Sequence, residues 1–313
     1  MTKILTVTFN PALDLATSAA CVEPNRKLRC APETAEAGGG GVNVARAVTQ
    51  LGGKAQALVA LGGPNGAALG GILDAMQLDW CRVEAPGDTR HSFSVTDESR
   101  GDQYRFVLTG PVWTSEQLDA VLNQIAETTA EDTLIVFSGS MPPGAQVGFL
   151  SEAAARLLPR RVIIDTSGPH LESAAKGEAP APFILRMDSH EARELSGLPL
   201  ESKKDSADFA ETLRQRGAAE CVVIARGADG SVMAAPDGLW HVNAANDNVV
   251  SAIGAGDSFV GGMVMGLANG ERPEQALRMG AAAASAAVLS KGTQLCLPAD
   301  YARMLPVTHL TQL

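Results

Sequence analysis

Four residues, Gly254-Ala255-Gly256-Asp257, open a segment whose later apolar residues are spaced as on a helix. Small residues at a helix start expose backbone N–H groups, which together with the helix dipole form a cradle for an anion. A carboxylate beside that cradle could accept a hydroxyl proton while the cradle stabilises charge on a phosphoryl group in transfer. Asp257 is therefore a candidate general base, although a first-turn carboxylate can also serve only to complement the dipole.

A run of four glycines, 38–41, precedes Asn43 and a second helical pattern. Backbone N–H groups in such a run can face a ligand without obstruction by Cβ atoms, and the Asn43 amide can exchange hydrogen bonds with hydroxyl groups. Asp14 follows the first apolar strand, where doubly wound sheets bind their ligands. These residues together indicate a polyol-binding turn, whereas the glycines alone are equally typical of a flexible loop.

Basic residues stand out in two polar, alternating segments at about 15–35 and 87–108. They are Lys27, Arg29, Arg90 and Arg105. In an acidic protein such residues could converge as a clamp for phosphate, which guanidinium and ammonium groups match in charge and hydrogen bonding. Taken alone, each is better explained as a solvated strand residue.

Two further polar groups lie beside predicted strand ends. The segment Ser138 to Gly144 contains Ser140 and two prolines, which predicts a rigid turn with hydroxyl groups on the same rim. Asp188 and Glu191 are spaced i, i+3 at a predicted helix start, so both carboxylates would face one way and could hold Mg²⁺ through water. Without other context, these two are better explained as a charged helix N-terminus.

Several familiar catalytic motifs are absent. The chain has no GxxxxGK[ST] phosphate loop, GxGxxG fingerprint, protein-kinase HRD or DFG motif, or GxSxG elbow. Its five histidines are dispersed, and its five cysteines lack CxxC or Cys/His metal spacing. The sequence therefore gives no support for a P-loop enzyme, a nicotinamide dehydrogenase, an α/β-hydrolase or a zinc protein. The scattered cysteines indicate reduced thiols.

Composition is that of an ordinary globular protein: of 313 residues, 45% are apolar and 19% are charged. The formal net charge of −10 argues against a general surface for nucleic acid or anionic membranes, so an anionic ligand would need a local basic cluster. The first residues alternate like a strand rather than a secretory signal, and no apolar run approaches the roughly 18 residues of a membrane span. We therefore expect a cytoplasmic protein.

Short apolar runs alternate with amphipathic segments, the pattern of parallel strands covered by helices on both faces. The predicted strands are 4–9, 56–61, 133–137, 162–165, 183–185 and 221–225. Helices are predicted around 44–51, after a Thr114-x-x-Gln117 capping box, and in the tail around Tyr301. We predict a doubly wound α/β fold with a mostly parallel sheet and a small antiparallel β lid. The core would comprise 1–14, 36–86 and 109–313, and the lid 15–35 and 87–108.

Together these motifs resemble the ribokinase-like sugar kinases, in the phosphofructokinase-B (PfkB) branch. The two signatures of that family correspond to 38–47 and 254–258, and the resemblance extends from Thr6 to the segment 292–296. Within the branch, Lys27-Leu-Arg-Cys30, Gln103-Tyr-Arg-Phe-Val107 and the segment 138–144 look most like the minor bacterial 6-phosphofructokinases. The resemblance implies transfer of the γ-phosphoryl group of ATP to a sugar hydroxyl, with Mg²⁺ as cofactor.

The resemblance also implies roles for individual residues. Asp257 would be the base, with Gly254, Ala255 and Gly256 as the anion hole. Sugar hydroxyls would be bound by Asp14, Gly39, Gly40 and Asn43. The sugar phosphate would be clamped by Lys27, Arg90 and Arg105, with Arg29 and Ser140 nearby. The nucleotide would lie against Ala225, Arg226, Gly227, Gly230, Gly254 and Gly256, and the metal near Asp188 and Glu191. In this family the lid also pairs two subunits, which implies a homodimer in which Lys27 reaches across.

Three departures from the family pattern fall on the nucleotide side. Asp188 stands where the branch usually has Asn, within Arg186-Met-Asp in place of Lys-Pro-Asn. Ala225 precedes the Gly-x-x-Gly turn where a Ser or Thr is common, and Arg226 is expected to supply charge there instead. Ala252 replaces a Thr two residues before the catalytic turn. These changes leave open a weaker use of ATP, another donor or another metal requirement.

We therefore expect a Mg-dependent sugar-phosphate kinase that phosphorylates fructose 6-phosphate at its 1-hydroxyl. Fructose 1-phosphate and tagatose 6-phosphate stay open as alternative acceptors, because they differ only in phosphate position or one stereocentre. A non-catalytic sugar-phosphate sensor on the same fold is the alternative from another class, since a fold does not guarantee chemistry. The intact Asp257 turn argues against the sensor.

Overall fold

A ten-stranded sheet forms the centre of the computed structural model, which describes residues 2–177, 180–245, 248–290 and 294–313. Gly292 and Thr293, at the end of the family resemblance, lie outside the described residues. The strands of this main sheet are β1 (Ile4–Thr8), β4 (Gln56–Leu61), β5 (Trp80–Glu84), β8 (Leu134–Ser138), β9 (Arg161–Asp165), β10 (Ile184–Asp188), β11 (Cys221–Ala225), β12 (Ser231–Ala235), β13 (Gly238–Val242) and β14 (Leu310–Gln312).

Strand order in the main sheet is β14-β13-β12-β11-β10-β9-β8-β1-β4-β5. Pairing from β11 to β5 is parallel, whereas β12, β13 and β14 continue the sheet in antiparallel pairs. All six predicted strands lie in the parallel part, which confirms the doubly wound arrangement. The antiparallel extension was not predicted, because β12 is buried at every position and so lacks the alternation that marks a strand.

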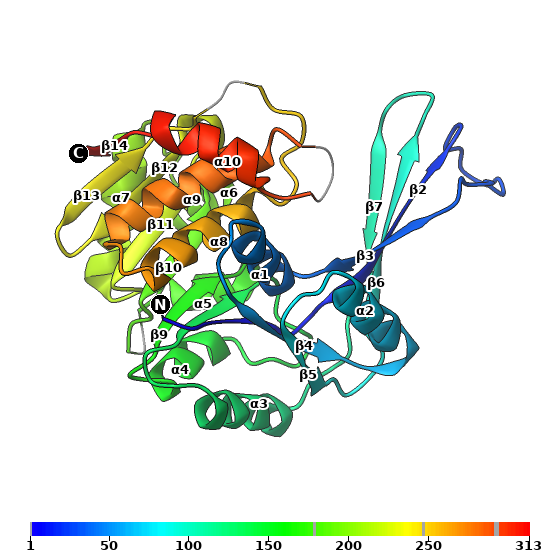
Figure 1. Ribbon diagram of the computed structural model, residues 1–313, viewed down its shortest axis with the longest axis horizontal. Helices are drawn as coiled ribbons and strands as arrows, with labels where there is room; N and C mark the ends of the chain where they lie inside the picture. The colour runs from blue at the N-terminus through cyan, green and yellow to red at the C-terminus, as the bar shows by residue number, and fades with distance from the viewer. Residues whose placement is uncertain (1, 178–179, 246–247, 291–293) are drawn as a thin grey trace.

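Helices cover both faces of the main sheet (Figure 1). Their bounds are α1 Gly40–Gln50, α2 Gly63–Ala75, α3 Ser115–Thr128, α4 Phe149–Arg156, α5 Gly168–Ala174, α6 Ser189–Ser196, α7 Lys203–Arg216, α8 Ala255–Ala268, α9 Pro273–Ala287 and α10 Pro298–Met304, with short 3₁₀ turns at Gly227–Asp229 and Leu305–Val307. One apolar core packs α3–α7 against strand residues such as Leu5 and Val7, and the other packs α1, α2, α8 and α9 against residues such as Ile4 and Ile163. Within the described ranges, no helix is both long enough and apolar enough to traverse a bilayer.

A second, four-stranded sheet projects from the main body and forms the lid (Figure 1). Its strands are β2 (Ala12–Ala19), β3 (Thr34–Gly38), β6 (Arg90–Asp97) and β7 (Gln103–Val107), in the order β3-β2-β6-β7. The expected antiparallel pairs are β2–β3 and β6–β7, but the central pair β2–β6 is parallel. This difference follows from connectivity, because β2 continues from β1 and β6 from β5, and both leave the carboxyl edge of the parallel sheet.

Helix α3 offers a test of local stability. Its predicted capping box is present: the Thr114 hydroxyl accepts from the Gln117 N–H at 3.3 Å, and the Gln117 side chain accepts from the Thr114 N–H at 2.9 Å. Thr114→Ala should lower the free energy of unfolding by about 1 kcal/mol, measured by urea denaturation. Thr128→Ala, in the last turn of the same helix, is the matched control and should change it by less than about 0.5 kcal/mol. Equal effects of both changes would contradict the capping role.

Candidate active site

The candidate catalytic turn lies at the start of α8. Gly254 is the N-cap and adopts a left-handed conformation with φ 75°, where a Cβ would lie 2.6 Å from Cδ2 of Leu295. Glycine is therefore required at this position. The Ala255 N–H donates back to Ala252, but the N–H groups of Gly256 and Asp257 belong to a first helical turn and have no intrahelical acceptor. This geometry suits an anion cradle.

Among the described residues, the Asp257 carboxylate accepts one side-chain hydrogen bond, and it is largely withdrawn from water. The Asn43 side-chain amide donates to Oδ2 of Asp257 at 2.9 Å. Burial, reinforced by the negative charge of Asp165, raises the pKa of Asp257 to about 6, while Asn43, Arg186 and Arg46 act in the opposite direction. Such a carboxyl is ionised at neutral pH and is more basic than an ordinary aspartate, as a general base should be.

A buried ion pair lies beneath this turn. Asp165, at the end of β9, accepts from the Ser138 hydroxyl at 2.9 Å and from Nη1 of Arg186 at 3.0 Å. The Asp165 and Arg186 side chains are only 11% and 15% exposed. A Cβ at Gly256 would lie 3.3 Å from Nη2 of Arg186, so the guanidinium contacts the backbone of the catalytic turn.

Asp165, Arg186 and Arg46 were not predicted from the sequence to take part in catalysis. A usable signal was present for the first two, because Asp165 and Arg186 are polar residues near the carboxyl ends of otherwise apolar strands, at the edge where ligands bind. For Arg46 the signal was its spacing, i+3 from Asn43 on the same helix.

The glycine run brings the lid and the core together. Gly39 is the N-cap of α1 with φ 138°, and a Cβ at Gly40 would lie 2.4 Å from the Ser138 hydroxyl oxygen. A Cβ at Gly38 would lie 2.2 Å from Oδ2 of Asp14, so the lid strand β3 approaches the Asp14 carboxylate as closely as a backbone can. The run is therefore a packed junction, in which Gly38 contacts Asp14 of the lid and Gly40 contacts Ser138 of the main sheet.

One face of the lid carries acidic and basic groups. Asp14 and Ser92 are paired in register, and Arg90 and Arg105 lie on the same face at neighbouring positions. Burial raises the pKa of Asp14, while a hydrogen bond with Ser92 and the charges of the two arginines lower it. Arg90 is anchored by the carbonyl of Asn10, at 3.1 Å from Nη2.

Ser140 lies beside the anchor of Arg90, since Nδ2 of Asn10 donates to its hydroxyl at 3.3 Å. The structure thus brings Asp14, Arg90 and Ser140 to one rim, with Arg105 farther out on the exposed strand β7. Lys27 and Arg29 are different. Both are exposed in the connection between β2 and β3, and neither has a hydrogen bond or ion pair among the described residues.

The predicted nucleotide side is only partly as expected. Ala225 ends β11, and Gly227 and Gly230 flank a 3₁₀ turn, each with positive φ. The expectation that Arg226 supplies charge to a nucleotide is wrong for its side chain, which is 6% exposed and pairs with Asp229. Its guanidinium donates to the carbonyls of Leu200 and Glu201 and to the Ser206 hydroxyl, so it is used to hold the connection before α7.

Asp188 and Glu191 form a reciprocal capping box at the start of α6. Oδ1 of Asp188 accepts from the N–H groups of His190 and Glu191 at 2.8 and 2.9 Å, and Oε2 of Glu191 accepts from the Asp188 N–H at 2.7 Å. Within the described ranges, no cluster of three or more metal-ligating side chains occurs. Each carboxylate nevertheless keeps one oxygen without a donor among the described residues. This pair fits Mg²⁺, which usually takes one or two carboxylates together with waters and substrate phosphates.

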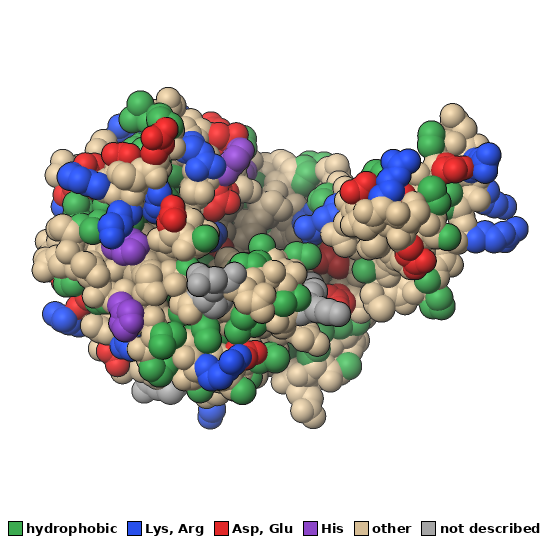
Figure 2. Space-filling view, turned by 90° about the horizontal axis from the view of Figure 1, so that it is seen from above, with side chains coloured by type: hydrophobic (Ala, Val, Ile, Leu, Met, Phe, Trp, Pro, Cys, Tyr) green, Lys and Arg blue, Asp and Glu red, His purple; other side chains and the backbone are tan. Residues whose placement is uncertain are grey.

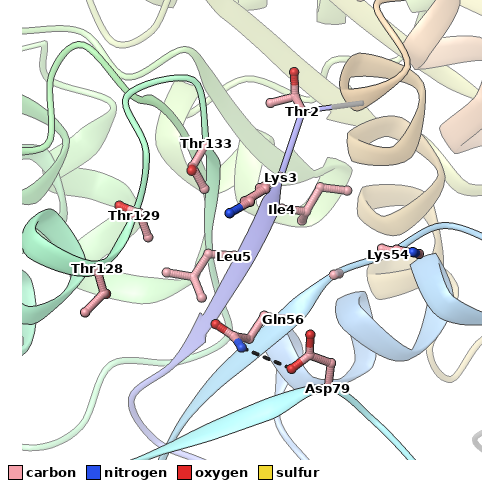
Figure 3. Close-up of a pocket in the computed structure, with 11 residues that line it drawn as sticks. Thr2, Lys3, Ile4, Leu5, Lys54, Gln56, Asp79, Thr128, Thr129 and Thr133 are labelled. Atoms are coloured by element: carbon pink, nitrogen blue, oxygen red, sulfur yellow. Dashed lines mark hydrogen bonds between the residues drawn. The ribbon is translucent and has the colours of Figure 1, made fainter.

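A separate cavity of about 660 Å³ opens at the opposite edge of the main sheet (Figure 3). It lies at the amino-terminal ends of β1, β4 and β8, where Lys3, Gln56 and Thr133 line it. Ligands of open α/β sheets bind at the carboxyl ends, and none of the predicted site residues lines this cavity. The candidate active site therefore lies at the carboxyl edge, beside the hollow that Figure 2 shows between the lid and the main body.

Known proteins share both sequence and architecture with this chain. Residues 8–300 match the pfkB family of carbohydrate kinases. ATP-dependent 6-phosphofructokinase isozyme 2 of Mycobacterium tuberculosis is 35% identical over 96% of this chain and 88% of its own length. The 1-phosphofructokinase of Bacillus subtilis is 28% identical over 99% of this chain and 100% of its own length. The crystal structure of phosphofructokinase-2 from Escherichia coli in complex with fructose-6-phosphate superposes with a TM-score of 0.88 at 33% identity, covering 98% and 99% of the two chains.

The fold, the helix-start turn with its carboxylate and these relatives define a phosphotransferase that acts on an alcohol group of a sugar. The chain belongs to the pfkB family of carbohydrate kinases. Its ribokinase-like architecture, with a central sheet and a small second sheet, is the one that the sequence predicted.

The pKa of Asp257 leads to a pH prediction. If its carboxylate takes the proton, kcat/KM should fall as pH drops through about 6, because protonation removes the base from the free enzyme. Asp257→Asn should lower kcat by several orders of magnitude, and it should also raise the thermal midpoint, because burial of the charged form destabilises the folded state above that pKa. Steady-state kinetics from pH 5 to 8 and thermal unfolding at pH 7.5 test both points. A variant that keeps most activity would remove Asp257 from the mechanism.

Proposed function

We propose that this protein transfers the γ-phosphoryl group of ATP to the 1-hydroxyl of fructose 6-phosphate. The observation that carries the proposal is that Asp14, Arg90 and Arg105 share one face of the lid, so groups that could bind sugar hydroxyls and groups that could bind a phosphate lie side by side. Two relatives named for 6-phosphofructokinase activity, or for a complex with fructose-6-phosphate, support the same acceptor.

In the proposed reaction, Asp257 accepts the proton of the 1-hydroxyl as the oxygen attacks the phosphoryl group. The N–H groups of Gly256 and Asp257 donate hydrogen bonds to the phosphoryl oxygens and stabilise their negative charge, because these N–H groups lie at the positive, N-terminal end of α8. The Arg186 guanidinium, in contact with the backbone of Gly256, adds a fixed positive charge at the same place. Charge stabilisation of this kind supplies most of the catalysis in phosphoryl transfer, where little covalent chemistry is required of the protein.

On the nucleotide side, the free oxygens of Asp188 and Glu191 would hold Mg²⁺, which when bound neutralises charge on the phosphates. Burial, together with the carboxylate of Asp188, raises the pKa of Glu191, so a cation between the two groups would relieve their repulsion. On the sugar side, Asp14 would bind sugar hydroxyls while Arg90 and Arg105 hold the phosphate. Closure of the lid over both substrates would exclude water and limit wasteful hydrolysis of ATP.

The proposal includes a homodimer in the cytoplasm. The outward face of the lid presents Phe93 paired directly with Phe106, and these side chains are 36% and 56% exposed. Burying this apolar pair against its copy would suit an isologous interface. Lys27 and Arg29, which have no partner within the described chain, would then reach the neighbouring site. All five cysteines are free, as suits a reducing compartment.

The acceptor can be identified by a direct assay. We expect ADP release from MgATP with fructose 6-phosphate at a kcat/KM at least 10-fold above that with either alternative acceptor; tenfold corresponds to about 1.4 kcal/mol. Fructose 1-phosphate would be disfavoured because the lid arginines match a 6-phosphate, and tagatose 6-phosphate because Asp14 would bind the sugar hydroxyls, one of which points the other way in tagatose. Asp257→Asn serves as the inactive control. A preference for fructose 1-phosphate would favour the activity for which the Bacillus subtilis relative is named.

The role of the lid arginines can be tested separately, through the KM for the sugar phosphate. Arg90→Ala and Arg105→Ala should each raise KM for the sugar phosphate by roughly 10- to 100-fold, since a hydrogen bond to a charged group contributes about 1.5–3 kcal/mol. KM for ATP should change little. Arg82→Ala is the matched control, because Arg82 lies on the edge strand β5 and pairs with Glu84 at 2.9 Å. An unchanged sugar KM in both lid variants would exclude the clamp.

A further inference from the structure

Arg46 is linked to the catalytic carboxylate through a single amide. It lies on α1, one turn after Asn43, and its Nη1 donates to Oδ1 of Asn43 at 3.0 Å. Nδ2 of Asn43 then donates to Oδ2 of Asp257 at 2.9 Å. The three side chains form a chain of hydrogen bonds that runs from a guanidinium to the proposed base.

The direction of this chain is fixed by the chemistry of its ends. A guanidinium can only donate, and an ionised carboxylate can only accept. The amide of Asn43 between them must therefore turn its oxygen toward Arg46 and its NH₂ group toward Asp257. In the opposite orientation, the amide oxygen would face a carboxylate oxygen and two N–H groups would face each other, and both contacts would be repulsive.

Arg46 also interacts electrostatically with carboxylates on both sides of the site. Burial lowers the pKa of Arg46, while attraction to Glu36 of the lid and to Asp257 of the core raises it. Glu36 lies on β3, in register with Asp14 on β2. The guanidinium thus stands between a lid strand and the catalytic helix. The charged groups that act on Asp257 are then Asp165 from β9, Arg186 from β10 and Arg46 from α1.

We propose that Arg46 is a positioning residue of the transfer reaction: it locks the Asn43 amide so that Oδ2 of Asp257 is held by a donated hydrogen bond and Oδ1 is left for the acceptor hydroxyl. No donor to Oδ1 occurs among the described residues. The inference rests on the proposed role of Asp257 as the base. It also changes the role given to Asn43, whose amide is committed at both ends and keeps one N–H for a sugar.

A double-mutant cycle tests the chain of hydrogen bonds from Arg46 through Asn43 to Asp257. Arg46→Met and Asn43→Ala should each lower kcat by roughly 10- to 100-fold. The KM for the sugar phosphate should change less, because these variants lose the orientation of the Asp257 carboxylate rather than contacts with the sugar. The double variant should be no slower than the slower single variant, since both changes break one chain. Arg82→Met, an equal loss of guanidinium on the distant strand β5, should leave kcat unchanged. Losses that multiply in the double variant would overturn the proposal.

A pH profile separates positioning from a merely structural role. Arg46→Met removes a positive charge and the partner that orients Asn43, so the acid limb of kcat/KM should move to a higher pH than in the wild type, where the pKa of Asp257 is about 6. Arg46→Lys keeps the charge and one donor and should return the limb toward wild type. If Arg46 only stabilised the fold, its removal would lower the thermal midpoint and leave the limb in place.

A measurement without turnover keeps this inference distinct from the proposed reaction. Carboxyl carbon resonances of protein labelled with ¹³C-aspartate can be titrated, and the Asp257 signal assigned by its loss in Asp257→Asn. A higher pKa of Asp257 in Arg46→Met than in the wild type supports the chain, and equal values refute it. If Asp257→Asn instead keeps its activity, the assignment of the base fails while the titration still reports on the link to Arg46.

Discussion

The structure depends on keeping one carboxylate charged where water is scarce. Asp257 lies at the meeting point of α1, α8, β9 and β10, and its ionised form is disfavoured both by burial and by Asp165. The hydrogen bond from Asn43, the charges of Arg46 and Arg186 and the positive end of α8 offset that penalty. The balance leaves a carboxyl that is ionised near neutral pH and still basic, which is the compromise that general base catalysis requires.

Close approach of backbones makes this balance possible. Ser138, at the end of β8, lies within contact distance of Gly40 and donates to Asp165, so one strand end joins the glycine run to the ion pair under the catalytic turn. Side chains larger than hydrogen at these glycines would push the elements apart and admit water. The same packing holds Asp14 against Gly38, which positions the proposed sugar-binding carboxylate beside the start of α1.

The sequence predicted the structure best where a feature is encoded by residues that are close together in the chain. Apolar runs located the parallel strands except β5, whose sequence Trp-Cys-Arg-Val-Glu is not a continuous apolar run, and the small residues before Asp257 located the helix start. The Thr114 capping box was also found, because it is encoded within four residues. Side-chain direction was beyond reach: nothing in Ala225-Arg226-Gly227 indicates that the guanidinium turns back to the carbonyls before α7. Asp165 and Arg186, far apart in the chain, meet only because β9 and β10 are neighbours in the sheet.

The lid is attached to the body by four passages of the backbone: between β1 and β2, between β3 and α1, between β5 and β6, and after β7. A flap on a single tether could swing widely and would lose much conformational entropy whenever it docked. A sheet fastened at four points moves chiefly by bending near its base, where Gly110 already packs against Asn10. The four passages therefore limit how far the lid has to move when it closes, so less order has to be gained at each turnover than a flap on a single tether would require.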